Sequence, residues 1–280
     1  MSAPEDSNAR SKAKLARIYD DSAGFYHRDN YLKNTCYAPL KYRQLYIERM
    51  IQDLNLSGST RILDIGCGPG ELVLALTKRG YEVWGIDISS AMAQEATETL
   101  ADGGFATFRH ICIGDAEQLS FRDESFDVVI AAGVLEYQRQ DAPSLSEMRR
   151  VLRKGGYLIL NVTNSLSYVA LSDEVYQWVK RKRPVKRVLS LIKERLLSRG
   201  PVSTIPLRRL HLPEKFDREL ATFGFQKIKH NYFRFSPLPI PFNSLLRSVC
   251  DYTGRYMERL TASPIGFIGG GYLVLCVKRV

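Results

Sequence analysis

The stretch Arg61–Gly70 reads RILDIGCGPG and constrains the fold of this chain more than any other segment. A short apolar run, typical of a buried strand, ends in an acid, Asp64, and glycines follow at alternate positions, Gly66, Gly68 and Gly70. The helical pattern ELVLALT begins at once. A strand that turns directly into a helix through glycines is how α/β folds bring a ligand close to bare backbone. The segment therefore predicts an α/β protein with a ligand site at this turn.

The loop departs from the dinucleotide fingerprint G-x-G-x-x-G/A. Counting from Gly66, the sixth position is Glu71, whose carboxylate would repel a pyrophosphate. The acid-x-G-x-G-x-G form instead resembles motif I of the class I S-adenosylmethionine-dependent methyltransferases. Their cofactor has no phosphate, but its amino-acid tail carries an ammonium group, which suits an acid at Asp64. A glycine-rich turn without a ligand is the alternative.

Four further segments resemble the same family, in the same order, so that the resemblance covers about residues 60–164. They read EVWGIDIS, CIGDAEQLSF, SFDVVIAAGVLEY and EMRRVLRKGGYLILNVTN. The strand-like run in the first of them ends in Asp87, about 20 residues after the glycines, where an acid can accept both ribose hydroxyls. The resemblance implies a site for S-adenosylmethionine. Its predicted cofactor-binding residues are Asp64, Gly66, Gly68, Gly70, Asp87, Ile88, Met92, Asp115, Ala116, Ala132 and Tyr26.

Several of these residues have a second interpretation. Asp87 could cap the following helix instead of binding ribose. Asp115 resembles the family's acceptor for the adenine amino group, and Met92 its apolar contact to adenine, although Met92 could simply pack in the core. Tyr19 and Tyr26 resemble lid residues that cover the cofactor, and a tyrosine there could instead anchor a helix.

The expected fold is α/β: a Rossmann-like, seven-stranded, mostly parallel sheet with an antiparallel last strand and helices on both faces. Residues 1–56 would form a helical lid, disordered over 1–10 and helical over 11–56. Residues 57–164 would form the cofactor-binding core, and residues 165–215 a basic helical insertion. Residues 216–280 would supply a helix, ended by Gly224, and the last two strands at 225–235 and 270–278. The cofactor would lie over the carboxyl ends of the first, second and fourth strands.

The charge of the chain is concentrated in the insertion. Lys180–Arg209 holds eleven basic residues and one acid, a net charge of +10, which equals the formal charge of all 280 residues. Val185, Val188, Leu189, Ile192 and Leu196 share one helical face. A basic amphipathic helix predicts contact with an anionic membrane surface or a partner. RNA binding and packing on the protein's own core remain alternatives.

Other features suit a cytoplasmic enzyme, which the basic insertion would allow to associate peripherally with the inner face of a membrane. The five cysteines are scattered and form no metal-ligand spacing, so no metal site is predicted. No signal peptide is evident at the start, and the apolar stretch near the end is too short to span a bilayer. Residues 231–246 mix aromatics and prolines between the last two strands, where an apolar acceptor would find a wall; a well-packed connection is the alternative.

The chemistry expected is in-line transfer of a methyl group to a positioned nucleophile. The exit of the fourth strand reads AAGVLEY and lacks the motifs typical of DNA-base or arginine methylation. A small-molecule or lipid-like acceptor, methylated on oxygen or carbon, is therefore favoured. The candidate general bases are Glu136, His211 and His27, each of which could instead be structural. An RNA methyltransferase and a non-methylating protein that binds the cofactor are the other hypotheses.

Overall fold

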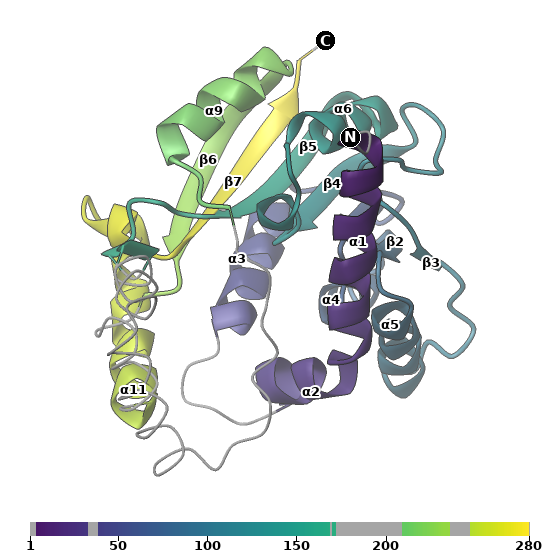
Figure 1. Cartoon of the computed structure of the whole chain (residues 1–280), viewed down its shortest axis with the longest axis horizontal. Coiled ribbons are helices and arrows are strands. Elements are labelled where there is room, and N and C mark those ends of the chain that lie inside the picture. Colours follow the sequence, from purple (N-terminus) through teal and green to yellow (C-terminus); the bar gives the residue numbers. More distant parts are fainter. Residues whose placement is uncertain (1–3, 33–38, 169, 172–208, 236–246, 280) are drawn as a thin grey trace.

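A computed structural model describes residues 4–32, 39–168, 170–171, 209–235 and 247–279 (Figure 1). The helices are α1 (Pro4–Asp20), α2 (Ala23–His27), α3 (Pro39–Asp53), α4 (Glu71–Thr77), α5 (Ser90–Asp102), α6 (Ala142–Val151), α9 (Pro213–Thr222) and α11 (Arg247–Met257). Short turns are the π-helix η1 (Arg28–Leu32) and the 3-10 helices η2 (Leu135–Tyr137), η3 (Glu258–Ala262) and η4 (Gly266–Ile268). The strands are β1 (Arg61–Ile65), β2 (Glu82–Asp87), β3 (Ile111–Ile113), β4 (Phe126–Ala132), β5 (Leu152–Thr163), β6 (Phe225–Phe233) and β7 (Gly271–Lys278).

The strands form one seven-stranded sheet in the order β3-β2-β1-β4-β5-β7-β6. Strands β1 to β5 pair in parallel, whereas β7 runs antiparallel to both β5 and β6. This topology confirms the predicted sheet with its antiparallel last strand. The strand order switches sides at β1, because β2 and β3 lie on one side of it and β4 lies on the other. Open α/β sheets bind ligands at such a switch point.

Helices cover both faces of the sheet, which explains why β4 is apolar on both sides. One core cluster packs α6 and α9 against the sheet, through residues such as Met148 and Phe216. The other packs α3, α4 and α5 against the opposite face, through residues such as Met50 and Leu76. Val128, Val129 and other β4 side chains alternate between the two clusters.

The segment before β1 differs from the expectation. Helix α1 begins at Pro4, so the prediction that residues 1–10 are disordered is wrong for Pro4–Arg10. The helical prediction for 11–56 is confirmed only in part, because residues 21–22 form a turn and α3 ends at Asp53. In Figure 1, α1 crosses the molecule beside α5. Its Asp20 accepts hydrogen bonds from the Ser89 hydroxyl (2.6 Å) and the Ala91 amide (3.0 Å), at the start of α5.

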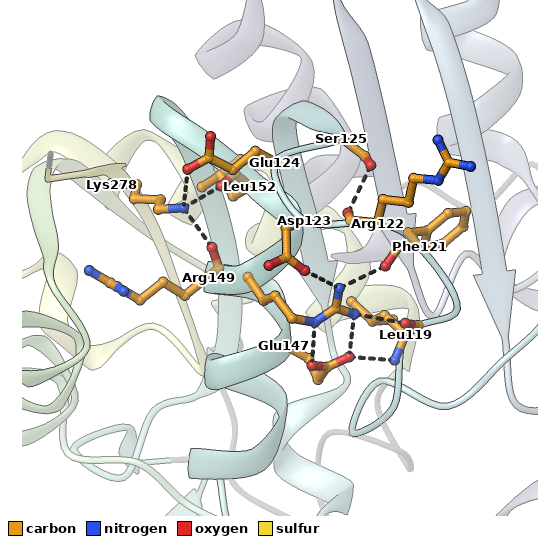
Figure 2. Close-up of polar contacts among 11 residues, drawn as sticks. Leu119, Phe121, Arg122, Asp123, Glu124, Ser125, Glu147, Arg149, Leu152 and Lys278 are labelled. Atoms are coloured by element: carbon orange, nitrogen blue, oxygen red, sulfur yellow. Dashed lines mark hydrogen bonds and ion pairs between the residues drawn. The ribbon is translucent and has the colours of Figure 1, made fainter.

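The loop between β3 and β4 is fixed by one arginine of α6 (Figure 2). The Arg150 guanidinium donates to the carboxylates of Glu147 and Asp123 and to the carbonyls of Phe121 and Leu119. A planar guanidinium suits such a set of acceptors because its donors form a rigid fork. This network holds the loop against α6.

The predicted basic insertion falls mainly outside the described residues, as do residues 236–246 of the predicted apolar wall. Helix α9 and strands β6 and β7 follow the predicted positions closely, and Gly224 ends the α9 segment with a φ of 75°. None of the helices in the described part of the chain combines the length and the apolar character needed to cross a membrane.

Candidate functional site

The three glycines after β1 all have positive φ, but each meets a different environment. The φ values of Gly66, Gly68 and Gly70 are 70°, 53° and 81°. A Cβ on Gly66 would lie 2.5 Å from a methyl of Val134, and a Cβ on Gly70 would lie 2.9 Å from Ala96. A Cβ on Gly68 would meet nothing within 4 Å. Gly68 therefore borders open space, whereas Gly70 lets α4 and α5 approach closely.

Asp87 connects this loop to the end of β2. Its Oδ2 accepts the Gly68 amide and its Oδ1 accepts the Ser89 amide, each at 2.9 Å. Burial raises the pKa of Asp87, and the backbone hydrogen bonds oppose that effect. The N-cap of α5 is Ser89, whose hydroxyl accepts the Met92 amide at 3.1 Å. Ser89, rather than Asp87, is therefore the residue that caps α5.

A cavity of about 400 Å³ lies at the carboxyl ends of β1, β2 and β4 and beneath the N-terminal helices. It brings together most residues predicted to bind the cofactor. Those that line it are Gly66, Gly68, Asp87, Ile88, Met92, Asp115, Ala116, Ala132 and Tyr26. Gly70 lies outside this lining and packs closely against Ala96.

Asp64 lines a small adjoining cavity together with Arg43 of α3. Burial raises the pKa of Asp64 to about 7, which the nearby Arg43 opposes and Asp87 reinforces. Arg43 lines both cavities, and a Cβ on Gly133 would lie 2.8 Å from its Nη1. A carboxylate and a guanidinium therefore border the same small cavity where the glycine loop begins. Sequence reasoning missed Arg43, because it comes from α3 and no motif surrounds it.

Asp115 also lines the larger cavity, and both of its carboxylate oxygens already accept hydrogen bonds. Its Oδ2 accepts the Lys12 ammonium at 2.6 Å, and its Oδ1 accepts the Glu117 amide at 2.9 Å. Lys12 also contacts the Glu117 carboxylate at 2.6 Å. Helix α1 thus reaches the predicted adenine contact through an ion pair that the sequence did not indicate.

Glu136 is the one candidate base that lines the cavity among the described residues. It is buried in η2, and its Oε2 accepts the Thr163 hydroxyl at 3.0 Å. The charge of its carboxylate also acts to raise the pKa of Arg43. Glu136 is therefore the candidate base that borders the space where a ligand would bind.

The two candidate histidines are held by carboxylates outside the cavity lining. His27 lies with Nδ1 2.7 Å from Glu95 and Nε2 2.9 Å from Glu71. Burial lowers the pKa of His27, but the two carboxylates outweigh it and raise the pKa above its ordinary value. With both nitrogens bonded to acids, the cationic form of His27 is favoured, and the side chain fastens α2 to α4 and α5.

His211 pairs with Asp141 at 3.1 Å and packs edge-on against Phe216. The same carboxylate holds Arg209 at 2.7 Å, so one charge of the predicted basic segment is neutralised locally. These contacts, and its position away from the cavity, give His211 a structural environment and not that of a base facing the acceptor.

Tyrosines of the N-terminal segment line the cavity. Tyr19 contacts Tyr26 and Tyr137 edge-on, with ring centroids 6.1 and 5.9 Å apart. All three line the cavity. No group of three or more metal-ligating side chains is found within the described ranges.

Comparison with known proteins agrees with this geometry. Residues 63–160 match a family described as a methyltransferase domain. The chain is 36% identical over 137 residues to the ubiquinone/menaquinone biosynthesis C-methyltransferase UbiE of Bordetella avium (strain 197N), covering 46% of this chain and 53% of that protein. It is 30% identical over 155 residues to a demethylmenaquinone methyltransferase of Staphylococcus aureus (strain JH9), covering 54% and 61%. The chain thus spans little more than half the length of these relatives.

Solved structures share the fold over nearly the whole chain. The [4+2]-cyclase SpnF superposes with a TM-score of 0.62 at 19% identity, covering 96% of this chain and 97% of that one. A possible histamine N-methyltransferase of Thermotoga maritima gives a TM-score of 0.57 at 19% identity, covering 94% and 99%. Residues 63–160 thus match the methyltransferase-domain family, within a fold that solved S-adenosylmethionine-dependent methyltransferases share.

Proposed function

We propose that this protein transfers a methyl group from S-adenosylmethionine to a small aromatic acceptor of the quinol type, at a ring carbon. The observation that carries the proposal is that one cavity joins the glycine loop, Asp87 and Glu136 beneath the lid. The two relatives with quinone-related names support this acceptor class.

The residues at the glycine loop fit the cofactor's chemistry. The space beside Gly68 is where a Cβ would point, so bare backbone can approach a ligand there. Asp64 and Arg43 together present one anion and one cation, which match the ammonium and carboxylate of an amino-acid tail. Asp87 would bind the ribose hydroxyls, Asp115 the adenine amino group, and Met92 the adenine face.

When bound, the cofactor supplies a methyl group on a sulfonium, which is already a strong electrophile. The protein's part is to hold the acceptor close, exclude water and remove a proton. Glu136 is the proposed base, because it is buried, lines the cavity and is oriented by the Thr163 hydroxyl. The tyrosines Tyr19, Tyr26 and Tyr137 would cover the reacting groups.

Two alternatives remain open to experiment. An RNA methyltransferase would use the basic segment Lys180–Arg209, which apart from Arg209 lies outside the described residues. The second alternative is a protein that uses this fold without methyl transfer, since SpnF carries the name of a cyclase. The fate of the methyl group separates these alternatives.

The test incubates the protein, without oxygen, with methyl-labelled S-adenosylmethionine and a short-chain 2-prenyl-1,4-naphthoquinol. We expect S-adenosylhomocysteine release and label in the quinol. Asp87→Ala should weaken cofactor binding by calorimetry about tenfold or more, because buried hydrogen bonds to a charged group are lost. Asp102→Ala, at the exposed end of α5, should leave binding unchanged. Label in RNA, or cofactor binding with no S-adenosylhomocysteine release from any fraction of a cell extract, would contradict the proposal.

A further inference from the structure

Arg234, directly after β6, has a backbone conformation that arginine seldom adopts. Its φ is 63°, in the left-handed region that glycine enters freely and other side chains enter at a cost. A turn that only had to change direction would be served better by glycine or asparagine. Strained residues of this kind concentrate at functional sites, where the surrounding structure enforces them.

The surroundings of Arg234 do enforce its conformation. Phe233 and Phe235, on either side, are both buried. The Arg234 amide donates to the Glu258 carboxylate at 2.9 Å, and its carbonyl accepts the Gly270 amide at 3.0 Å. Both backbone polar groups and both neighbouring side chains are therefore fixed.

The run of glycines before β7 provides the space for this turn. A Cβ on Gly269 would lie 2.9 Å from the Phe233 carbonyl, and a Cβ on Gly271 would lie 2.4 Å from the Phe233 ring. A Cβ on Gly270 would lie 3.2 Å from the Arg234 carbonyl. The GGG sequence is thus explained by close packing against the residues around Arg234.

Glu258 also ties this turn to the lid. The buried carboxylate accepts the Tyr46 hydroxyl of α3 at 2.9 Å while it accepts the Arg234 amide. Helix α3 is the element that carries Arg43. The turn at Arg234 is therefore linked through Glu258 to the helix that carries Arg43.

Arg234 is exposed and lines the cavity in the half opposite to Asp115. Asp115 follows β3 at one edge of the sheet, whereas Arg234 follows β6 at the other edge. The half near β1 and β2 holds the proposed cofactor residues, which leaves the half near β5, β6 and β7 for the acceptor. Asn161, Thr163 and Gly271 line this second half.

We infer that Arg234 is an acceptor-binding residue whose guanidinium pairs with an anionic oxygen, such as the phenolate of a quinol. This inference rests on the proposed function and names the group that recognises its acceptor. A guanidinium suits an anionic oxygen because its hydrogen bonds are charge-assisted. Glu258 is the positioning residue that holds the backbone from which this side chain extends.

The experiment measures binding of 2-prenyl-1,4-naphthoquinol, kept free of oxygen, to the protein saturated with S-adenosylhomocysteine. Arg234→Asn removes the cation but tolerates the left-handed backbone. We expect it to weaken quinol binding about tenfold or more and to leave S-adenosylhomocysteine affinity within about twofold of the wild type. Arg234→Lys should retain part of the quinol affinity. The melting temperature of Arg234→Asn should equal or exceed that of the wild type.

Asn55→Gly is the matched control, because Asn55 also has a left-handed φ, 49°, but is exposed in the loop before β1. It should bind both molecules as the wild type does. Unchanged quinol affinity in Arg234→Asn would overturn the inference. Failure of the wild type to bind the quinol while it still binds S-adenosylmethionine would also overturn it, and would leave the transferase assignment intact. Failure to bind S-adenosylmethionine would instead refute the proposed function.

Discussion

At the scale of single residues, the three glycines after β1 look alike in the sequence but have different surroundings. Gly68 faces open space, whereas Gly70 faces Ala96 of α5. All of them need positive φ, which costs a residue with a Cβ about 1 kcal/mol. A substitution at each position should therefore affect binding and stability in different proportions.

We predict that Gly68→Ala abolishes most cofactor binding while it lowers stability by only about 1 kcal/mol, the cost of the backbone strain. Gly70→Ala should lower stability further, by about 2 kcal/mol or more, because it adds overpacking against Ala96 to the same strain. Urea unfolding and calorimetry with S-adenosylmethionine measure the two effects. Equal destabilisation by both substitutions, with equal loss of binding, would contradict the separation of roles.

Asp64 should make cofactor binding depend on pH. Its pKa is raised to about 7 by burial, so the carboxyl group is protonated below that pH and ionised above it. Only the ionised form pairs with an ammonium group. We expect the affinity for S-adenosylmethionine to rise about tenfold between pH 6 and pH 8. Asp64→Asn should bind weakly and show a flatter profile by calorimetry; an unaltered slope in this variant would exclude Asp64 as its source.

At the scale of elements, the lid is fastened by ion pairs and by hydrogen bonds to a carboxylate, made from separate helices. Lys12 and Asp20 fasten α1, and His27 fastens α2 between Glu71 and Glu95. Each contact joins the lid to an element that borders the cavity. The lid position should therefore respond to the protonation of these groups.

We predict that the His27 contact weakens at high pH. The pKa of His27 is raised in the folded protein above its ordinary 6.5, so its stabilising effect is complete below 6.5 and is lost as pH rises through the raised value. Hydrogen exchange of the α2 amides, corrected for the intrinsic effect of pH, should show lower protection above that value. His27→Gln should remove this pH dependence, and a variant that kept it would show that another group is responsible.

Elements of the sheet could be predicted because their signals are local. The run VVIAA in β4 is buried on both faces, and the glycines after β1 need conformations that few residues adopt. Arg43 could not be found this way, since it meets Asp64 only after α3 packs on the sheet. Likewise, the sequence placed His211 near the acceptor but could not show that Asp141 holds it.

At the scale of the whole molecule, the cavity joins three parts of the chain that are distant in sequence. The lid contributes Tyr26 and Arg43, the core contributes Gly68 and Asp87, and the turn after β6 contributes Arg234. Neither the glycine motif nor the last strands alone could form a closed site. A methyltransferase domain matched over 63–160 thus depends on flanking segments for its proposed acceptor.

A crystal structure of the protein soaked with S-adenosylmethionine tests the central claim most directly. We expect the amino-acid tail between Asp64 and Arg43, the ribose on Asp87 and the ring system beside Met92. An empty cavity under these conditions, in a protein that instead binds NAD at the same loop, would contradict the assignment.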